Sequence, residues 1–418
     1  MKKVLFISFY WPPSGKASIH WPLKMIKYLP DYGWQPTVLV SKDDSFTAKD
    51  ESLLNEIPGE LEVIKSDFWD PFVYYKKFLG KEKDEILVAS EAMSKTNKSL
   101  KHKFALWVRL NLFIPDARMG WYRPAVKEAS EYLKNNKIDA IVSNGPPHIS
   151  HLIGKKLSKK FNIPLVSVFI DPWVDISYYI GQKRNKLTLA VDNKLEKSVM
   201  KHSSRVVVVT NTLKDYFINK YPFIKNKIHV LRWGYNEDDF SKVENINSNE
   251  KVILHAGNIF DFQNIPEFWK TIKKQIEKGN KLKLKFIGTV SPAVKKTIEE
   301  IGLTGYTEYV GFLPYEEVLK ELCKASYLLV CATEPRHFPG KLYEYMRAGK
   351  PIIAFGNDNA EVAEVLNETK SGILFRYEDT AEEFFEEAEK IKTDLEKVKQ
   401  FDRKVISENL AVILNNIC

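Results

Sequence analysis

Short apolar runs that alternate with longer amphipathic segments constrain the fold of this chain more than any other feature of its sequence. The first run, Lys3 to Phe9, is almost continuously apolar, which is typical of a strand buried on both faces of a parallel sheet. A turn-rich loop and a helix over 17–32 follow, and Gly33 ends that helix. The next expected strand is Thr37 to Val40. This opening predicts a doubly wound α/β domain.

The alternation continues along most of the chain and is interrupted twice. Residues 67–122 mix aromatic side chains with lysines and predict an insertion of helices, whereas the polar residues 235–250 predict a linker. From Thr380 onward the sequence predicts a charged helical tail. Between these segments we expect strands at 139–143, 165–169, 205–209, 252–255, 282–287, 307–310, 327–331 and 351–355, and helices at 123–135, 149–161, 185–201, 213–220, 265–277, 292–301, 315–323 and 340–347.

The two series predict two doubly wound parallel-sheet, Rossmann-like domains that face a cleft. The first domain spans residues 1–235 and the second spans 236–400, while 401–418 form a C-terminal helix that packs back on the first domain. Because the strands of both sheets point their carboxyl ends toward the cleft, we expect the binding site there.

Composition excludes several classes of protein. With 28% charged and 12% aromatic residues, the chain has the profile of a soluble globular protein. No apolar run approaches the roughly 18 residues that span a bilayer. The opening residues resemble a signal peptide only superficially, because Pro12 and Pro13 follow at once. The three cysteines have no paired or metal-like spacing, which indicates a reducing cytosol without disulfides or zinc.

Positive charge is concentrated in the first part of the chain. Up to Tyr235 there are 38 lysines and arginines against 23 acidic residues, and the remainder has 25 against 31. The basic half suggests that one domain faces something anionic, such as nucleic acid, an anionic membrane or a phosphorylated substrate. A lysine-rich surface kept for solubility explains the same charge equally well.

The common nucleotide-binding signatures are missing from the sequence. No G-x-G-x-x-G follows an expected strand, which argues against a dinucleotide dehydrogenase. Residues 14–18 resemble the end of a P-loop, but Tyr10 stands where that motif needs a glycine. This argues against a Walker-type NTPase.

The most informative segment is PGKLYEYMRAGKP, residues 339–351. It predicts a helix that begins after Gly340 and ends at Gly349, with Lys341 and Glu344 on one face of the first turn. Free backbone N–H groups and a lysine there suit a phosphate, and a carboxylate can accept paired sugar hydroxyls. The alternative is an ordinary exposed ion pair between the two side chains.

This segment resembles the nucleotide-sugar-binding helix of GT-B glycosyltransferases of the family-4 type. Other segments resemble the same family in the same order, and together they cover nearly the whole chain: FYWPPSGKASIHWPLKMIKYLPDYGWQPTVLV, IPDARMGWYRPAV, SNGPPHISHLIGKKL, IPLVSVFIDPW, YVGFLPYEEVLKELCKASYLLVCA and GILF. The PPH, DPW and PGKxxEY segments resemble one subgroup. The resemblance implies a GT-B architecture and a transferase that moves a sugar from a nucleoside-diphosphate sugar to a glycan or lipid-linked acceptor.

The resemblance also implies that the second domain binds the donor. In the family, a glutamate at the position of Glu344 holds the donor ribose, and the strand, turn and helix matching 309–332 wrap the nucleobase. The donor-binding residues that it implies in this chain are Gly257, Asn258, Gly311, Phe312, Gly340, Lys341, Leu342 and Glu344.

The chain departs from the family pattern at the donor diphosphate. Arg336 stands where the family often has a glutamate, and residues 255–264 lack the arginine and lysine that often clamp the diphosphate. In one interpretation Lys341, with Arg336 or Arg232, supplies the missing positive charge. In the other, the protein is a degenerate transferase that binds glycans or a partner without catalysis. The retained glycine-bearing turns favour the first.

Four residues of the first domain are further candidates. Gly15 would let a backbone N–H approach the donor phosphate or the acceptor, and Lys16 would add charge unless it is a solvated loop lysine. His148 occupies the place where the resemblance implies a histidine close to the transferred sugar; with the neighbouring His151, it could instead pack locally. Asp171, at the next strand end, would orient an acceptor hydroxyl or form only an Asp-Pro turn. We assign catalytic roles to His148 and Asp171.

The resemblance implies retention of anomeric configuration, with the leaving phosphate accepting the proton of the acceptor. The protein then contributes positioning and electrostatic stabilisation. We expect neither a metal nor another cofactor. The lysines and aromatic residues of 67–122 suit docking on an anionic leaflet, and a helical subdomain with a solvated lysine face is the alternative.

These features predict a cytoplasmic enzyme, peripheral on the inner membrane face, that helps to make a surface polysaccharide. No nucleic-acid-binding module is recognised in the sequence, so nucleic acid is not an expected partner. The nearest enzymatic alternative is a nucleotide-sugar epimerase or hydrolase on the same fold.

Overall fold

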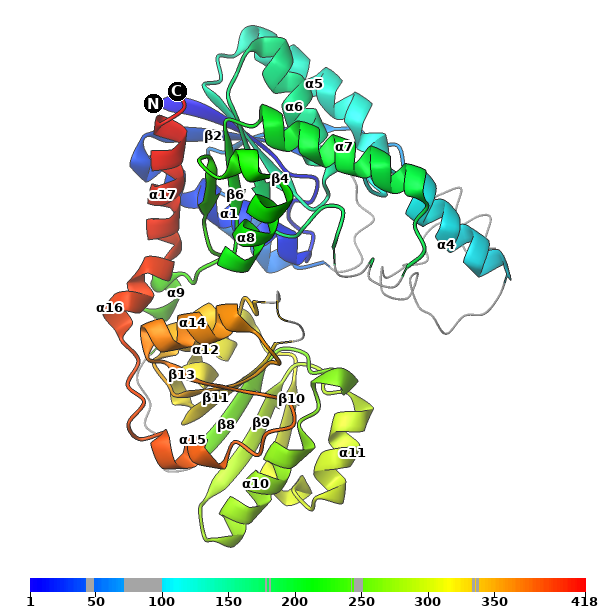
Figure 1. The fold of residues 1–418 in the computed structure, drawn as a ribbon. Helices are drawn as coiled ribbons and strands as arrows, with labels where there is room; N and C mark the ends of the chain where they lie inside the picture. Colours follow the sequence, from blue (N-terminus) through cyan, green and yellow to red (C-terminus); the bar gives the residue numbers. More distant parts are fainter. Residues whose placement is uncertain are drawn as a thin grey trace. The chain divides into compact units, whose positions relative to one another are not determined.

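The computed structural model contains two compact units, each built on one parallel β-sheet (Figure 1). It describes residues 1–42, 49–70, 100–176, 179, 182–241, 243, 251–332, 335 and 338–418. Unit 1 consists of residues 1–232 and 407–418, and unit 2 of residues 233–406.

The sheet of unit 1 has seven parallel strands in the order β3-β2-β1-β4-β5-β6-β7. The strands are β1 Lys2–Ile7, β2 Trp34–Ser41, β3 Glu62–Ser66, β4 Ala140–Gly145, β5 Leu165–Phe169, β6 Arg205–Val208 and β7 Ile228–Val230. The strand order reverses between β1 and β4. Such a switch point is where doubly wound folds bind ligands, just beyond the carboxyl ends of the strands.

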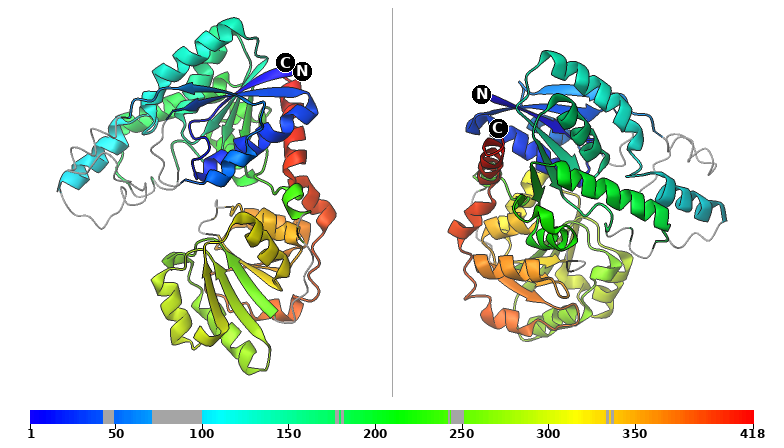
Figure 2. Two further views of the ribbon diagram at one scale, coloured as in Figure 1. Left: turned by 180° about the vertical axis from the view of Figure 1, so that it is seen from behind. Right: turned by 45° about the horizontal axis from the view of Figure 1, so that its top comes forward.

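Helices cover the sheet of unit 1, as the two further views in Figure 2 show. They are α1 His20–Tyr28, α4 Leu100–Leu112, α5 Tyr122–Asn135, α6 Ile149–Phe161, α7 Lys186–His202 and α8 Asn211–Lys220. Leu5 and Ile7 of β1 pack in one core with Ala125 of α5 and Ile153 of α6. The last helix of the chain, α17 Arg403–Asn415, also contributes to this unit, since Trp34 Nε1 donates to Asn415 Oδ1 at 3.2 Å.

The sheet of unit 2 has six parallel strands in the order β10-β9-β8-β11-β12-β13, with its switch point between β8 and β11. The strands are β8 Lys251–Ala256, β9 Leu282–Ile287, β10 Thr307–Gly311, β11 Tyr327–Cys331, β12 Ile352–Phe355 and β13 Gly372–Phe375. The helices are α9 Glu237–Phe240, α10 Pro266–Glu277, α11 Pro292–Glu300, α12 Tyr315–Lys324, α13 Leu342–Ala348, α14 Ala360–Thr369, α15 Glu382–Glu387 and α16 Leu395–Val398.

Successive residues of β8 point to opposite faces of this sheet and belong to different cores. Leu254 packs with residues of α12, α13 and α14, whereas Ile253 packs with residues of α10 and α11. Burial on both faces is the reason these strands read as continuous apolar runs. The predicted fold class, two doubly wound parallel sheets, is therefore confirmed.

Three sequence-based expectations require correction, and a fourth lies partly outside the described residues. The short edge strands β3 and β7 were not predicted. The expected linker is structured at its start, because Tyr235 is buried and α9 follows it, while residues 244–250 lie outside the described residues. The charged tail is not one helix: α15, α16 and α17 are separate. Of the expected helical insertion, α4 is described and residues 71–99 lie outside the described residues.

Candidate functional site

Three glycines with positive φ line the carboxyl edge of the sheet in unit 2. Gly257 follows β8, Gly288 follows β9 and Gly311 ends β10, with φ of 110°, 103° and 79°. A Cβ atom on Gly288 would lie 2.8 Å from the carbonyl carbon and oxygen of Gly257. Only glycine fits such a close approach of two backbones. The sequence-based candidates included Gly257 and Gly311 but missed Gly288, although it too directly follows an apolar run.

Lys341 reaches this edge from the segment before α13. Its Nζ lies 2.7 Å from the carbonyl oxygen of Ala256 and 3.1 Å from Nε2 of His255. A Cβ on Gly257 would lie 3.0 Å from the same Nζ, so a larger residue there would displace the ammonium. Burial lowers the pKa of Lys341 to about 8. Lys341 thus places its ammonium at the carboxyl end of β8, one of the two strands at the switch point.

Glu344 faces different partners from Lys341. Its Oε1 accepts a hydrogen bond of 3.4 Å from the hydroxyl of Tyr315 and lies 3.6 Å from the guanidinium of Arg403. The side chains of Glu344 and Arg403 are only 12% and 10% exposed. Lys341 is the N-cap residue of α13, and its carbonyl oxygen accepts a hydrogen bond of 3.0 Å from the backbone N–H of Tyr345, so it stands at the start of the first turn that carries Glu344. Arg403, distant in sequence, carried no signal that sequence reasoning could use.

The remaining donor candidates lie around the same edge. Asn258 Oδ1 accepts a hydrogen bond of 3.1 Å from the backbone N–H of Thr289, which ties the loops after β8 and β9 together. Phe312 is 90% exposed, Gly340 has open space where a side chain would be, and Leu342 is buried. Arg336 lies outside the described residues.

In unit 1 the corresponding switch point holds two buried histidines. The ring of His148 stacks on Trp173 with centroids 5.2 Å apart and planes 2° apart. His151 Nδ1 lies 2.9 Å from Ser143 Oγ, inside a buried hydroxyl network. A Cβ on Gly145 would lie 2.5 Å from His151 Nε2. Burial lowers the pKa of His148 to about 3, so its imidazole is neutral at physiological pH.

Asp116 was missed by the sequence reasoning and holds the start of α6. Its two carboxylate oxygens accept hydrogen bonds from the backbone N–H groups of Arg118, at 2.8 Å, and Ile149, at 3.0 Å. Burial raises the pKa of Asp116 to about 6. In the sequence, the pair Pro115-Asp116 before a helix-rich segment was the signal that could have pointed to this residue. Asp116 therefore fixes the turn that carries His148.

Lys16 lies near a second cation. Burial and the charge of Arg118 both lower the pKa of Lys16. The Arg118 guanidinium lies over the rings of Phe9 and Phe68, at 5.1 and 5.4 Å from their centroids. Gly15, which precedes Lys16, is partly exposed. The carboxyl end of β1 thus carries two positive charges beside aromatic side chains.

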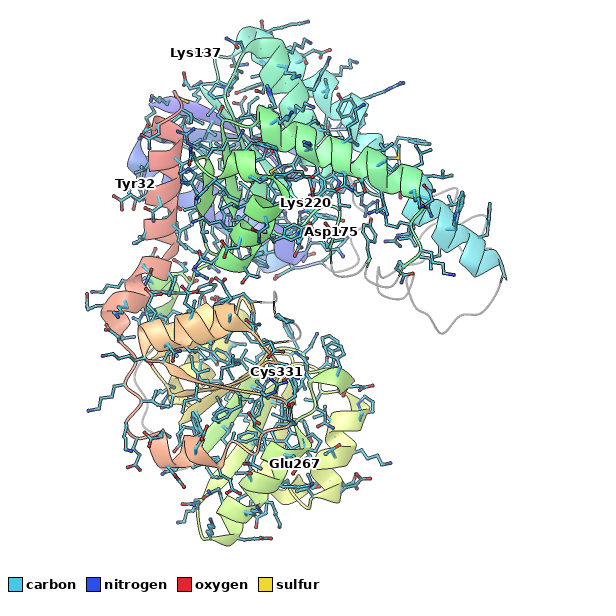
Figure 3. All side chains as sticks on the ribbon, viewed as in Figure 1. Tyr32, Lys137, Asp175, Lys220, Glu267 and Cys331 are labelled. Atoms are coloured by element: carbon cyan, nitrogen blue, oxygen red, sulfur yellow. The ribbon has the colours of Figure 1, made fainter. Side chains whose placement is uncertain are left out.

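The loop of Asp171 is held by acidic residues of α7. Asp171 is partly buried and follows β5. Two residues on, Trp173 Nε1 donates to Asp192 Oδ1 at 2.9 Å, and Val174 N donates to Glu196 Oε2 at 3.2 Å. Asp175 at the end of the loop pairs with Lys220 of α8 at 2.9 Å, and Figure 3 shows these two side chains pointing toward one another. Because Trp173 stacks on His148, the loop and the histidine form one assembly.

Within the described ranges, no three histidine, cysteine, aspartate or glutamate side chains are grouped as metal ligands. None of the described helices combines the length and the apolar character needed to cross a bilayer.

Two family models match the chain in succession. Residues 77–239 match Glycosyltransferase Family 4, and residues 236–407 match Glycosyl transferases group 1. No curated protein sequence matches the chain.

Solved structures share the fold over the full chain at low sequence identity. HepE from Anabaena, solved in complex with UDP, has 15% identity and a TM-score of 0.64, with 100% of both chains covered. A glycosyltransferase from Rickettsia africae has the same identity and TM-score, with 100% of this chain and 98% of that chain covered. The lipopolysaccharide outer core galactosyltransferase WaaB has 13% identity and a TM-score of 0.59, with 99% of both chains covered.

Two Rossmann-like halves, shared with these neighbours, define the GT-B fold. Since the two family models together span residues 77–407, the chain belongs to the family-4-type GT-B glycosyltransferases. The resemblance to this family is confirmed, whereas the subgroup stays a prediction.

Proposed function

We propose that this glycosyltransferase moves a hexose or related sugar from a nucleoside-diphosphate sugar to a glycan or lipid-linked acceptor, with retention of configuration and without a metal. The observation that carries the proposal is the position of Lys341. Its ammonium is held over Gly257 by two neutral acceptors, the carbonyl oxygen of Ala256 and Nε2 of His255. A cation held by neutral acceptors at a switch point, beside glycine turns, suits a donor diphosphate.

Glu344 would bind the donor ribose. A carboxylate can accept hydrogen bonds from two adjacent hydroxyl groups, and the neighbouring Arg403 and Tyr315 hold it in place. Phe312, almost fully exposed after Gly311, offers an apolar face to the nucleobase. These positions extend the donor site along the edge of one sheet, with Asn258 and the segment 340–342 beside it.

The assembly of His148 and Asp171 in unit 1 would position the reacting sugar and the acceptor. With its neutral ring stacked on Trp173, His148 can donate one hydrogen bond from one ring nitrogen and accept one at the other, but it carries no charge. Asp171, Gly15 and Lys16 would contact the acceptor or the donor phosphate. In this proposal the leaving phosphate accepts the proton of the acceptor, so no side chain acts as base.

Two relatives support the class of substrate. HepE was solved with UDP, and WaaB is a galactosyltransferase of the lipopolysaccharide outer core. The UDP bound to HepE is consistent with a nucleotide-sugar donor for this protein, and the activity of WaaB is consistent with a role in making a surface polysaccharide in the cytoplasm.

A surface of unit 1 supports docking at the inner membrane face. Phe104, Trp107 and Leu112 of α4 are exposed, and Leu187 at the start of α7 is 75% exposed. The two helices are joined where Asn185 N donates to Asn111 Oδ1 at 2.7 Å. Exposed Lys183 and Lys186 flank this apolar surface. Apolar side chains rimmed by lysines suit an anionic leaflet.

Vesicle co-sedimentation tests the membrane proposal. We expect binding to vesicles containing phosphatidylglycerol and much weaker binding to pure phosphatidylcholine. Trp107→Ser should weaken that binding, whereas Val412→Ser, an exposed apolar residue on α17, should not. Equal binding by the wild type and Trp107→Ser would contradict this role for α4.

The donor proposal is tested by thermal unfolding with a panel of nucleoside diphosphates and their sugars. A ligand that binds only the folded state stabilises it by about 2.7 kcal/mol at a hundredfold excess over Kd. We expect one base to be selected, and Lys341→Ala and Glu344→Ala to abolish its effect. Lys274→Ala, on the exposed surface of α10, is the matched control. A well-folded protein that responds to no nucleotide would instead support a degenerate transferase.

A further inference from the structure

His255 is a buried histidine that enters the proposed function only as one of the two acceptors for Lys341. It is the penultimate residue of β8 and is 1% exposed. Its Nδ1 lies 3.0 Å from the carbonyl oxygen of Leu329, in the neighbouring strand β11. Because a carbonyl can only accept, Nδ1 carries the hydrogen and Nε2 presents a lone pair. The backbone of β11 therefore fixes the tautomer of His255.

The free lone pair of His255 is directed at Lys341. Nζ of Lys341 lies 3.1 Å from Nε2 and donates to it, and a second N–H of the ammonium donates to the carbonyl oxygen of Ala256 at 2.7 Å. An ammonium has three N–H donors. Two acceptors on β8 thus fix the ammonium and leave its third hydrogen for a ligand.

The groups around the ammonium are neutral at physiological pH. Burial and the charge of Lys341 lower the pKa of His255 far below its ordinary value. Burial raises the pKa of the Cys331 thiol, at the end of β11 in Figure 3, to about 12. Burial also raises the pKa of Tyr345, whose hydroxyl accepts from the backbone N–H of Ala256 at 2.8 Å. These contacts orient the positive charge of Lys341 without neutralising it.

We infer that His255 is a positioning residue that directs the ammonium of Lys341 at the diphosphate of the donor, an inference that rests on the proposed function of this site. A carboxylate at position 255 would orient the lysine equally well but would cancel its charge. A phenyl ring at position 255 would keep the packing but leave the ammonium of Lys341 with one acceptor, the carbonyl oxygen of Ala256. The imidazole, locked in one tautomer by Leu329, provides orientation without charge.

The test separates binding of the diphosphate from binding of the nucleoside. Affinities for UDP, GDP and ADP, and for uridine, guanosine and adenosine, are measured calorimetrically on the wild type, His255→Phe and His255→Gln. For the preferred base we expect His255→Phe to lose about tenfold in diphosphate affinity, with nucleoside affinity unchanged. His255→Gln, whose amide oxygen can accept from Lys341, should recover most of that loss. His202→Phe, a partly buried histidine of α7 bonded to Ser158, should behave as the wild type.

Other results would overturn the inference. If Lys341→Ala loses diphosphate affinity but His255→Phe does not, His255 does not position the lysine, while the proposed function stands. If nucleoside and diphosphate affinities fall together in both His255 variants, the residue only supports packing. If the wild type binds no nucleoside diphosphate, the proposed function falls first and the inference with it.

A measurement on the wild type covers the case in which His255→Phe does not fold. Nitrogen NMR of protein labelled in histidine, with His255→Gln to assign the signal, reports which ring nitrogen carries hydrogen. We expect a neutral ring protonated at Nδ1 throughout pH 6–8. A ring protonated at Nε2 could not accept from Lys341 and would refute the inference.

Discussion

At the scale of single residues, the candidate donor site is defined by how its charges are paired. Lys341 is held by neutral acceptors, whereas Glu344 lies 3.6 Å from Arg403 in a largely buried pair. The ammonium of Lys341 therefore remains available to an anionic ligand. The carboxylate of Glu344 is held in place by the guanidinium of Arg403, which has little freedom of its own.

Removing the charge of Arg403 should therefore disturb both stability and donor binding. For Arg403→Leu we expect the free energy of unfolding to fall by about 2 kcal/mol, because Glu344 loses its cation in a partly desolvated position. We also expect the KM for the donor to rise several-fold. Arg376→Leu, whose partners Glu378 and Asp358 are exposed, should change stability by less than about 1 kcal/mol. Equal losses in urea unfolding of the two variants would argue against a special role for Arg403.

Lys341 also predicts how donor affinity varies with pH. Because burial lowers its pKa to about 8, diphosphate affinity should fall as the pH rises through 8. Folding stability should respond in the opposite direction. The unfolded chain, with a lysine pKa near 10.5, binds more protons between pH 8 and 10.5, so this group makes the folded state more stable as pH rises.

Calorimetric titrations at pH 7, 8 and 9 check this prediction. Lys341→Arg keeps its charge throughout that range and should flatten the dependence. An affinity of the wild type that is constant from pH 7 to 9 would show that the ammonium does not bind the diphosphate.

At the scale of elements, loops at the carboxyl ends of strands are fixed by residues far from them in sequence. Asp116 holds the first turn of α6, and Asp192 and Glu196 of α7 hold the loop of Trp173. Each of these acidic side chains accepts hydrogen bonds from groups on a different element. The geometry around His148 therefore depends on three elements rather than on its own turn.

The buried carboxyl of Asp116 predicts a pH-dependent stability. Its pKa is about 6 in the folded chain and near 3.8 when unfolded, so the folded state binds the proton more tightly. Stability should consequently rise as the pH falls from 6 toward 4, by at most about 1.4 kcal/mol per pH unit. Asp116→Asn should lack this contribution. This prediction is checked by measuring the free energy of unfolding of the wild type and of Asp116→Asn at pH 4.5, 5.5 and 7. A difference between the two proteins that does not change with pH would contradict the prediction.

At the scale of the whole molecule, the chain leaves unit 1, builds unit 2 and returns to unit 1 in its last twelve residues, 407–418. Leu410 and Leu414 of α17 are completely buried, whereas Val412 of the same helix is half-exposed. Unit 1 thus depends on residues from both ends of the chain.

This returning helix predicts unequal effects of two neighbouring substitutions. Leu414→Ala should lower the free energy of unfolding by about 2–4 kcal/mol, since it leaves a cavity in a core. Val412→Ala should change it by about 0.5 kcal/mol or less. Because Leu414 belongs to unit 1, whereas Lys341, Glu344 and Arg403 belong to unit 2, Leu414→Ala should keep its nucleotide affinity below the unfolding transition. Urea unfolding and calorimetry check both expectations, and similar stabilities of the two variants would show that α17 is dispensable to unit 1.

The sequence alone determined the elements that lie between two layers of helices. The expected strands 165–169, 282–287 and 327–331 and the expected helix 149–161 coincide with β5, β9, β11 and α6. A strand buried on both faces must be apolar throughout, and an abrupt change at each end marks its limits. The edge strands β3 and β7 are not required to be apolar throughout, and their sequences show no abrupt change that would mark their limits. Family membership also followed from the sequence, because its segments occur in a fixed order.

Only the tertiary structure decided which side chains meet. Lys341 and His255 are 86 residues apart, and Ile149 and Asp116 are 33 apart. Arg403 reaches Glu344 from the final helix. Local propensity and periodicity act over a few residues, whereas parallel strands bring distant loops to one edge of a sheet. The candidate residues could therefore be listed from the sequence, but their partners, and with them their charges, were set by the fold.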